Sequence, residues 1–263
     1  MKITIIGAGN MGGAIARGLA SGSLVKAEDI TVTAHTQATL DRLKADVPAL
    51  NTTLDNVAAA KGADIIMLAI KPWLIKDIIN EIKPSLDLSR QMIVSIVAGI
   101  PFDDLKVMLG NEDAVMFRVI PNTAISIKMS PTLMCCCNAD AAQTEYVKSL
   151  FDELGQAFVI EERLMAAGTA VTSCGIAYAF EYIKAAIQGA IELGLYPKVA
   201  KAMIDQTVAG AAALLEANGT MPDTEIYKVC TPGGITIKGL NEMSALGFDH
   251  AVISGLKKAA GKC

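Results

Sequence analysis

The segment from Lys2 to Arg17 reads KITIIGAGNMGGAIAR, and it decides the fold. An apolar strand runs into the pattern G-x-G-x-x-G, and a helix-forming stretch follows directly. Gly7 permits the tight turn, Gly9 lets a pyrophosphate approach bare backbone, and Gly12 lets the helix lie close to the sheet. The helix N-terminus favours an anion without the help of a basic side chain. The segment therefore predicts a dinucleotide site, against the alternative of an ordinary glycine-rich turn.

Short apolar strands alternate with amphipathic helices through residues 1–160. After the first strand, we expect strands at 30–33, 65–69, 92–96, 115–119, 132–136 and 156–160. Such alternation is typical of an α/β fold with a Rossmann-type, doubly wound parallel sheet. The strand at 65–69 is apolar at every position, which indicates burial on both faces and a central place in the sheet.

The remainder of the chain, residues 161–263, has only helical patterns, with helices expected at 161–194, 197–217, 222–229, 234–245 and 248–260. Alanine and glycine are frequent in these segments, which favours close helix packing and a subunit interface. The sequence thus predicts two domains, a dinucleotide-binding domain at 1–160 and an all-α domain at 161–263.

Composition excludes several classes of protein. The net charge is −4 and no lysine or arginine run occurs, so nucleic acid is not an expected partner. Hydrophobic residues make up 52% of the chain, which excludes disorder. The longest charge-free stretch, 164–180, is too short for a membrane span, and the N-terminus lacks a signal-peptide pattern, so we expect a cytoplasmic protein. Six cysteines without a C-x-x-C pair and two histidines predict reduced, buried thiols and no metal site.

Ligands of doubly wound sheets lie at the carboxyl ends of the strands. Lys71 and Pro72, residues 95–99 and residues 118–123 occupy such ends and are candidates for coenzyme contacts. The alternatives are a helix start for Lys71-Pro72 and a turn or cap for Asn122. The second strand ends in His35 and Thr36 without Asp or Glu, which favours NADPH over NADH, although His35 could be an ordinary solvated histidine.

The segment 230–236 reads CTPGGIT and precedes a predicted helix. Consecutive glycines can expose backbone N–H groups as a cradle for a small carboxylate. Thr236 would lie in the first helical turn with its hydroxyl free for a ligand. The alternative is that this threonine merely caps its own helix.

Six ordered segments together resemble the pyrroline-5-carboxylate reductase family over the whole chain: residues 7–12, 69–72, 95–99, 118–123, 206–210 and 231–236. The resemblance implies a Rossmann-type domain followed by an all-α dimerisation domain that interlocks with a second subunit, within larger rings of dimers. It also implies hydride transfer from NADPH, with NADH as the alternative coenzyme, to C5 of (S)-1-pyrroline-5-carboxylate, which gives L-proline.

The resemblance implies roles for single residues. The coenzyme residues are Gly7, Ala8, Gly9, Asn10, Met11 and Gly12 at the pyrophosphate, His35 and Thr36 at the 2′-phosphate, Asn56 at the adenosine, and Ala69, Ile70, Lys71, Pro72 and Ala98 at the nicotinamide ribose, with Asn122 as a further coenzyme contact. The substrate residues are Glu162, Thr231, Gly233, Gly234, Ile235 and Thr236. Thr236 would be catalytic, because it would orient the ring nitrogen and its proton.

Some positions depart from the family pattern. Residues 172–178 read TSCGIAY where the family commonly has SGSGPAY, and His35 stands where an arginine is frequent. Two other functions therefore stay open. A β-hydroxyacid dehydrogenase or imine reductase would use Lys184 and Gln188, spaced i, i+4, but the glycines that normally precede such a lysine are missing. A noncatalytic NADP-binding sensor would result if residues 172–176 block the pocket.

Overall fold

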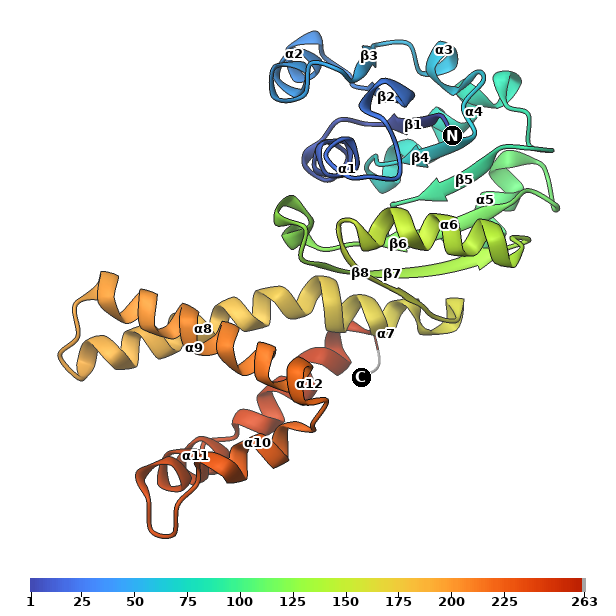
Figure 1. Cartoon of the computed structure of the whole chain (residues 1–263). Coiled ribbons are helices and arrows are strands. Elements are labelled where there is room, and N and C mark those ends of the chain that lie inside the picture. The colour runs from blue at the N-terminus through green and yellow to red at the C-terminus, as the bar shows by residue number, and fades with distance from the viewer. Residues whose placement is uncertain (262–263) are drawn as a thin grey trace. The chain divides into compact units, whose positions relative to one another are not determined.

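The computed structural model describes residues 1–261, which divide by their contacts into a first unit, Met1–Ser173, and a second unit that begins at Cys174 (Figure 1). The sequence places the domain boundary earlier, after residue 160. Residues up to 173 cluster with the sheet because Met165 is buried in the same apolar cluster as Leu133 of the sheet. The two units are described separately below.

The first unit contains one eight-stranded sheet in the order β3-β2-β1-β4-β5-β6-β7-β8. The strands are β1 Ile3–Ile6, β2 Ile30–Thr33, β3 Asn51–Thr53, β4 Ile65–Leu68, β5 Met92–Ser95, β6 Met116–Ile120, β7 Ser130–Cys137 and β8 Gly155–Val159. β4 lies between β1 and β5, as the apolar run at 65–69 predicts. β3 was not predicted, because this short edge strand reads only Asn-Thr-Thr.

One strand corrects the expectation of a wholly parallel sheet. β7 runs antiparallel to β6, with Arg118 opposite Cys135, whereas all other neighbours in the sheet are parallel. Parallel neighbours need a crossover connection of a dozen or more residues. Only the short 3-10 helix η4 (Thr123–Ile127) separates β6 from β7, so the chain turns back on itself.

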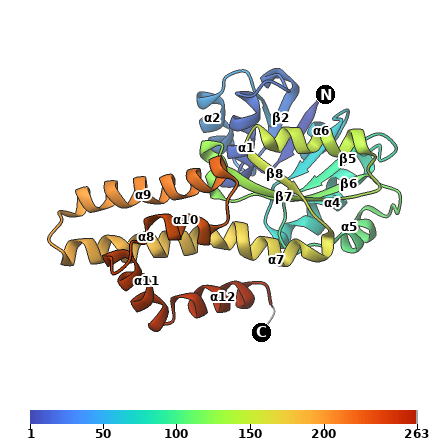
Figure 2. The ribbon, with the colours of Figure 1, turned by 60° about the horizontal axis from the view of Figure 1, so that its bottom comes forward.

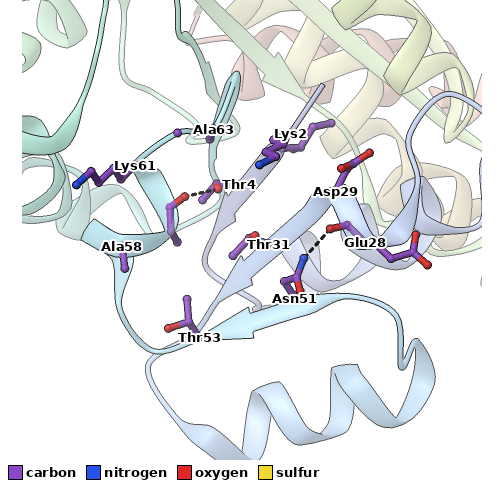
Figure 3. Close-up of a pocket in the computed structure, with 13 residues that line it drawn as sticks. Lys2, Thr4, Glu28, Asp29, Thr31, Asn51, Thr53, Ala58, Lys61 and Ala63 are labelled. Atoms are coloured by element: carbon purple, nitrogen blue, oxygen red, sulfur yellow. Dashed lines mark hydrogen bonds between the residues drawn. The ribbon is translucent and has the colours of Figure 1, made fainter.

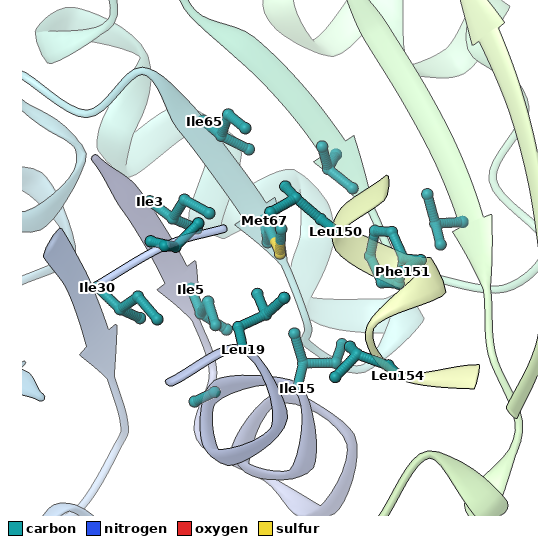
Figure 4. Close-up of a cluster of buried hydrophobic side chains, with 14 of the residues drawn as sticks. Ile3, Ile5, Ile15, Leu19, Ile30, Ile65, Met67, Leu150, Phe151 and Leu154 are labelled. Carbon is teal, nitrogen blue, oxygen red and sulfur yellow. The ribbon is translucent and has the colours of Figure 1, made fainter. Parts of the chain in front are cut away.

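Helices cover both faces of the sheet and create two buried apolar clusters. One face carries α1 (Asn10–Ala20), α2 (Gln37–Asp46) and α6 (Ala141–Asp152), and Ile15, Leu19 and Phe151 pack there against Ile3 and Met67 (Figure 4). The other face carries α3 (Asn56–Ala60), α4 (Ile75–Ile82) and α5 (Phe102–Leu109). The short 3-10 helices are η1 Ala27–Asp29, η2 Pro72–Leu74, η3 Lys83–Ser85 and η5 Glu162–Leu164.

The expected long helix at 161–194 consists of several pieces. η5 leads into α7 (Met165–Thr169), a π-helical turn at Ala170–Cys174 and α8 (Gly175–Glu192). The π turn contains residues 172–174, where the sequence departs from the family pattern. π-Helical turns are rare and frequently occur at functional sites.

The second unit contains α8, α9 (Pro197–Asn218), α10 (Pro222–Val229), α11 (Ile235–Ala245) and α12 (Phe248–Ala259), close to the predicted bounds (Figure 2). Pro197 and Pro222 each occupy a first helical position, where a missing N–H costs nothing. Among its described residues, only Ala200 is buried within these five helices. No helix within residues 1–261 has the length and apolarity needed to cross a membrane.

Candidate functional site

A cavity of about 1110 Å³ lies at the carboxyl ends of β1, β2 and β4. Its wall brings together residues from six segments of the first unit. They are Ile6, Gly7, Ala8, Gly9, Asn10, Met11, Thr33, Ala34, His35, Thr36, Thr39, Leu54, Asn56, Ala69, Ile70, Lys71, Leu74, Ile78, Glu81 and Ile96. The carboxyl ends of the strands are where ligands bind in doubly wound sheets.

The glycines of the first turn have separate roles in this wall. Gly7 has a φ of +105°, and an added Cβ would lie 2.6 Å from the carbonyl oxygen of Ala69. A Cβ on Gly12 would overlap the carbonyl oxygen of Gly7. At Gly9, by contrast, no described atom beyond its chain neighbours lies within 4 Å of an added Cβ. Packing thus requires glycine at 7 and 12, whereas Gly9 leaves backbone open to the cavity.

Helix α1 begins at this open backbone. Gly9 is its N-cap, and within the described chain no side chain caps the helix. The N–H groups of the first turn, at Asn10, Met11 and Gly12, have no intrahelical acceptor and carry the positive end of the helix dipole. This arrangement fits a pyrophosphate, as the sequence predicts.

A second helix N-terminus borders the same cavity. Thr36 is the N-cap of α2, and its Oγ1 lies 2.9 Å from Oγ1 of Thr39. His35 is exposed beside them. Thr33 Oγ1 is buried and has no hydrogen-bond partner among residues 1–261, although Thr33 lines the cavity. Two hydroxyls, an imidazole and a helix N-terminus fit a 2′-phosphate, and Thr39 adds a residue that sequence reasoning missed.

Another part of the cavity wall comes from α3 and α4. Nδ2 of Asn56 donates to the Glu81 carboxylate, at 3.1 Å from Oε2 and 3.4 Å from Oε1. Leu54, Leu74 and Ile78 supply apolar surface to this wall. Glu81 was also missed, because it lies near the C-terminal end of an ordinary amphipathic helix.

The predicted contacts to the nicotinamide ribose separate into two groups. Ala69, Ile70 and Lys71 line the cavity, joined by Ile96 at the end of β5. Pro72 and Ala98 do not line it. Pro72 is the first residue of η2. It therefore starts a helix, which is the alternative given above for Lys71-Pro72.

Asn122 acts as a cap and is only 5% exposed. Its Oδ1 accepts from the N–H of Ala124 at 2.9 Å, and its Nδ2 donates to the carbonyl oxygen of Thr172 at 3.2 Å in the π turn. Ser173 Oγ donates to the carbonyl oxygen of Pro121. These contacts match the turn-or-cap alternative, and coenzyme binding by Asn122 stays a prediction.

Glu162 is engaged in an ion pair. Its Oε1 lies 2.7 Å from Nη1 of Arg118 and also accepts from the N–H of Phe102 at 2.8 Å. The Arg118 side chain is 9% exposed, and its guanidinium lies 5.9 Å from the centre of the Phe102 ring. A substrate amine would have to compete with these partners, so a substrate role for Glu162 stays a prediction.

The turn that precedes α11 lies in the second unit. Gly233 has a φ of +71°, and the N–H of Gly234 donates to the carbonyl oxygen of Thr231 at 2.9 Å. Gly234, not Thr236, is the N-cap of α11, and no side chain of the described residues caps this helix. The capping alternative for Thr236 is therefore wrong. Its exposed hydroxyl lies in the first turn of an uncapped helix N-terminus, as a carboxylate site requires.

The cysteines correct one expectation. Cys135 is buried, and desolvation raises the pKa of its thiol to about 11. Four further cysteines are only half-buried, namely Cys136 and Cys137 at the carboxyl end of β7, Cys174 and Cys230, and Cys263 lies outside the described residues. No group of three potential metal-ligating side chains occurs within the described part of the chain.

A second, smaller cavity of about 350 Å³ lies at the opposite, amino ends of β1–β3 (Figure 3). Its border carries charges of both signs, from Lys2, Lys61, Glu28 and Asp29. Asn51 Nδ2 donates to the carbonyl oxygen of Glu28 at 2.6 Å. In doubly wound sheets, ligands bind outside the carboxyl ends of the strands, where the larger cavity lies. The larger cavity is therefore the candidate coenzyme site.

Comparison with known proteins gives consistent matches. A family model for pyrroline-5-carboxylate reductase dimerisation matches residues 162–263, and one for NADP oxidoreductase, coenzyme F420-dependent, matches residues 2–99. Pyrroline-5-carboxylate reductase 1 of Dictyostelium discoideum is 33% identical over 99% of this chain, which spans about half (49%) of that relative's length.

Pyrroline-5-carboxylate reductase 2 of Bacillus subtilis is 32% identical over 98% of this chain and 92% of its own length. The crystal structure of Plasmodium falciparum pyrroline carboxylate reductase with NADP bound has a TM-score of 0.88 and 27% identity, and the match covers 100% of this chain and 96% of that one. These two matches extend over both units of the chain.

Proposed function

This chain belongs to the pyrroline-5-carboxylate reductase family, and on that basis we propose that it reduces the C=N bond of (S)-1-pyrroline-5-carboxylate to L-proline, the last step of proline biosynthesis. The enzyme is an NADP-dependent oxidoreductase that acts on a CH–NH bond. The observation that carries the proposal is the open backbone at Gly9, which leaves room for a pyrophosphate at the N-terminus of α1.

NADPH is the coenzyme, and when bound it supplies the hydride. The first turn of α1 binds the pyrophosphate through free N–H groups. Thr36, Thr39 and His35 at α2 bind the 2′-phosphate, and Asn56 faces the adenosine. Ala69, Ile70 and Lys71 hold the nicotinamide ribose, supported by their common place in the cavity wall.

The turn at Thr231, Gly233, Gly234 and Ile235 binds the substrate carboxylate through backbone N–H groups at the start of α11. Thr236 Oγ1 then orients the ring nitrogen and its proton, and this fixes the carbon that faces the hydride donor. A protonated imine is already electrophilic, so alignment contributes more than a strong general acid. The uncapped α11 N-terminus supports this assignment.

The protein forms a homodimer through its helical unit, and larger rings of dimers are built from such pairs. Support comes from the surface of α8–α12, where large apolar side chains are exposed: Phe180, Met203, Leu214, Tyr227, Ile235, Leu246 and Ile253. Monomeric proteins rarely leave so much apolar surface in water. We also propose that the protein is cytoplasmic, as the sequence predicts.

Two other functions agree less well with the observed contacts. A β-hydroxyacid dehydrogenase would need Lys184 to polarise an alcohol, but its Nζ is paired with Glu181 at 2.6 Å on the exposed surface of α8. A noncatalytic sensor would bind the coenzyme without turnover, because residues 172–176 would block the substrate pocket. The Thr172 carbonyl oxygen and the Ser173 hydroxyl are instead bonded to Asn122 and Pro121. Reductase activity therefore agrees best with the observed contacts.

Two reactions of the purified protein test the proposal. One contains NADPH and the cyclic imine, and the other contains NADP and one of a series of β-hydroxyacids. We expect turnover of the imine alone. Oxidation of a hydroxyacid would favour the dehydrogenase. Coenzyme binding without turnover of either substrate would favour the sensor.

A further inference from the structure

We propose that Glu81 sets the coenzyme preference of this protein, because its carboxylate weakens binding of the 2′-phosphorylated coenzyme relative to the unphosphorylated one. The inference rests on the proposed function, which assigns the large cavity to a nicotinamide coenzyme. It concerns a residue that no sequence motif identifies.

Glu81 reaches the cavity from α4 together with Ile78, which lies on the same face of the helix at i−3, and with Leu74, the N-cap residue of α4. Both oxygens of its carboxylate lie within 3.4 Å of Asn56 Nδ2. An ionised carboxylate can only accept hydrogen bonds, so this contact fixes the orientation of the Asn56 carboxamide. Nδ2 is directed to Glu81, and Oδ1 is the group that remains for a ligand.

Between the apolar side chains of the α3–α4 wall, two groups can thus accept hydrogen bonds, Asn56 Oδ1 and the Glu81 carboxylate, and the second carries a negative charge. Such a surface suits donors, namely a ribose hydroxyl or the amino group of adenine. A phosphate dianion offers only acceptors and adds repulsion. In NAD-dependent Rossmann domains an acidic side chain at the end of the second strand binds the ribose hydroxyl. Here that position holds His35 and Thr36, and Glu81 introduces the acidic group from another element.

Other groups of the cavity favour the 2′-phosphate and so oppose the effect of Glu81. Thr36 and Thr39 at the N-terminus of α2 favour an anion, but His35 carries no permanent charge, and no lysine or arginine other than Lys71 lines the described wall. Without an arginine to dominate, a single carboxylate in the cavity changes the balance between NADPH and NADH. Because Glu81 is exposed, solvent and salt screen this effect, and we expect a shift of about three- to tenfold.

The test measures dissociation constants of NADPH and NADH by isothermal titration calorimetry on purified protein. Glu81→Gln removes the charge and keeps an acceptor for Asn56. Glu145→Gln on α6 is the matched control, because Glu145 is equally exposed and does not line the cavity. We expect Glu81→Gln to raise the preference for NADPH about three- to tenfold at low ionic strength, less at high salt, while the control leaves it unchanged.

Retained NADH binding by Glu81→Gln shows that the cavity is intact. An unchanged ratio of the two constants, or a parallel change of both, overturns the inference. If the wild-type protein binds neither coenzyme, the proposed function fails as well. Binding of NADPH by the wild type with no change of preference in Glu81→Gln defeats the inference alone.

Discussion

The Arg118 guanidinium and the Glu162 carboxylate form an ion pair at 2.7 Å that joins the middle of the sheet to the segment leading into α7. Arg118 is on β6, and its side chain is almost fully buried. The same oxygen of Glu162 accepts the N–H of Phe102 at the start of α5. One carboxylate therefore pairs with a buried cation and accepts from a helix N-terminus, while the buried Nε of Arg118 has no hydrogen-bond partner among the described residues.

Glu162→Ala should lower the free energy of unfolding by about 2 to 3 kcal/mol, because it leaves the buried Arg118 without its partner. Urea unfolding followed by circular dichroism measures the change. Glu161→Ala is the control, since Glu161 pairs with Arg163 at the surface and should contribute about 0.5 kcal/mol or less. Equal losses in the two variants would contradict the structural role of the Arg118–Glu162 pair.

Gly9→Val should abolish NADPH binding while the protein stays folded. No described atom beyond the chain neighbours lies within 4 Å of a Cβ added to Gly9, and its φ is −70°, so we expect the added side chain to disturb the place of the pyrophosphate and not the fold. Calorimetry with NADPH and a thermal melt provide the two measurements. Gly12→Ala is the contrasting variant, because its Cβ would overlap the Gly7 carbonyl and lower stability. Tight coenzyme binding by Gly9→Val would refute the phosphate site.

Much of the fold was accessible from local patterns. The strand, glycine turn and helix of residues 2–17 are local features. Helices α9 and α10 begin at Pro197 and Pro222, and proline is favoured at a first helical position. β3 and the reversal of β7 were not accessible. The first is a polar edge strand without an apolar signature, and the second depends on a short connection whose conformation no motif announces.

The residues of the candidate site also divide into those that the sequence predicted and those that it did not. Residues 7–11 and 69–71 line the cavity and lie next to strands in sequence, so the rule for strand ends identified them, whereas Gly12, also predicted, does not line it. Thr39 and Glu81 reach the cavity from helices, and only the tertiary fold brings them there. Asn122 and Glu162 satisfy buried partners, which a sequence pattern cannot distinguish from ligand contacts.

Thr236→Ala should reduce turnover of the cyclic imine about ten- to hundredfold and leave the dissociation constant of NADPH unchanged, because the hydroxyl orients the substrate and not the coenzyme. Steady-state kinetics and NADPH titration test this. Thr236→Ser should recover most of the activity. Thr224→Ala, an exposed threonine of α10, is the control. Wild-type turnover by Thr236→Ala would remove Thr236 from the mechanism.

The junction of α9 and α10 should weaken in acid. Hydrogen bonds from Lys228, Thr220 and Asn218 lower the pKa of Glu225 from 4.5 to about 2. A lowered folded-state pKa stabilises the fold above the unfolded value of 4.5, and this contribution is lost as the pH falls toward 2. The stability difference between wild type and Glu225→Gln should therefore shrink over that interval. Asp223→Asn in the same helix is the control, and a difference independent of pH would contradict the assignment.

Transfer of isotope from coenzyme to product tests the central claim most directly. The purified protein is incubated with (S)-1-pyrroline-5-carboxylate and NADPH that carries deuterium in the transferable position at C4 of the nicotinamide, and the product is analysed by mass spectrometry and NMR. We predict L-proline with a single deuterium at C5. No proline, or proline without deuterium at C5, would contradict the assignment as a reductase of the cyclic imine.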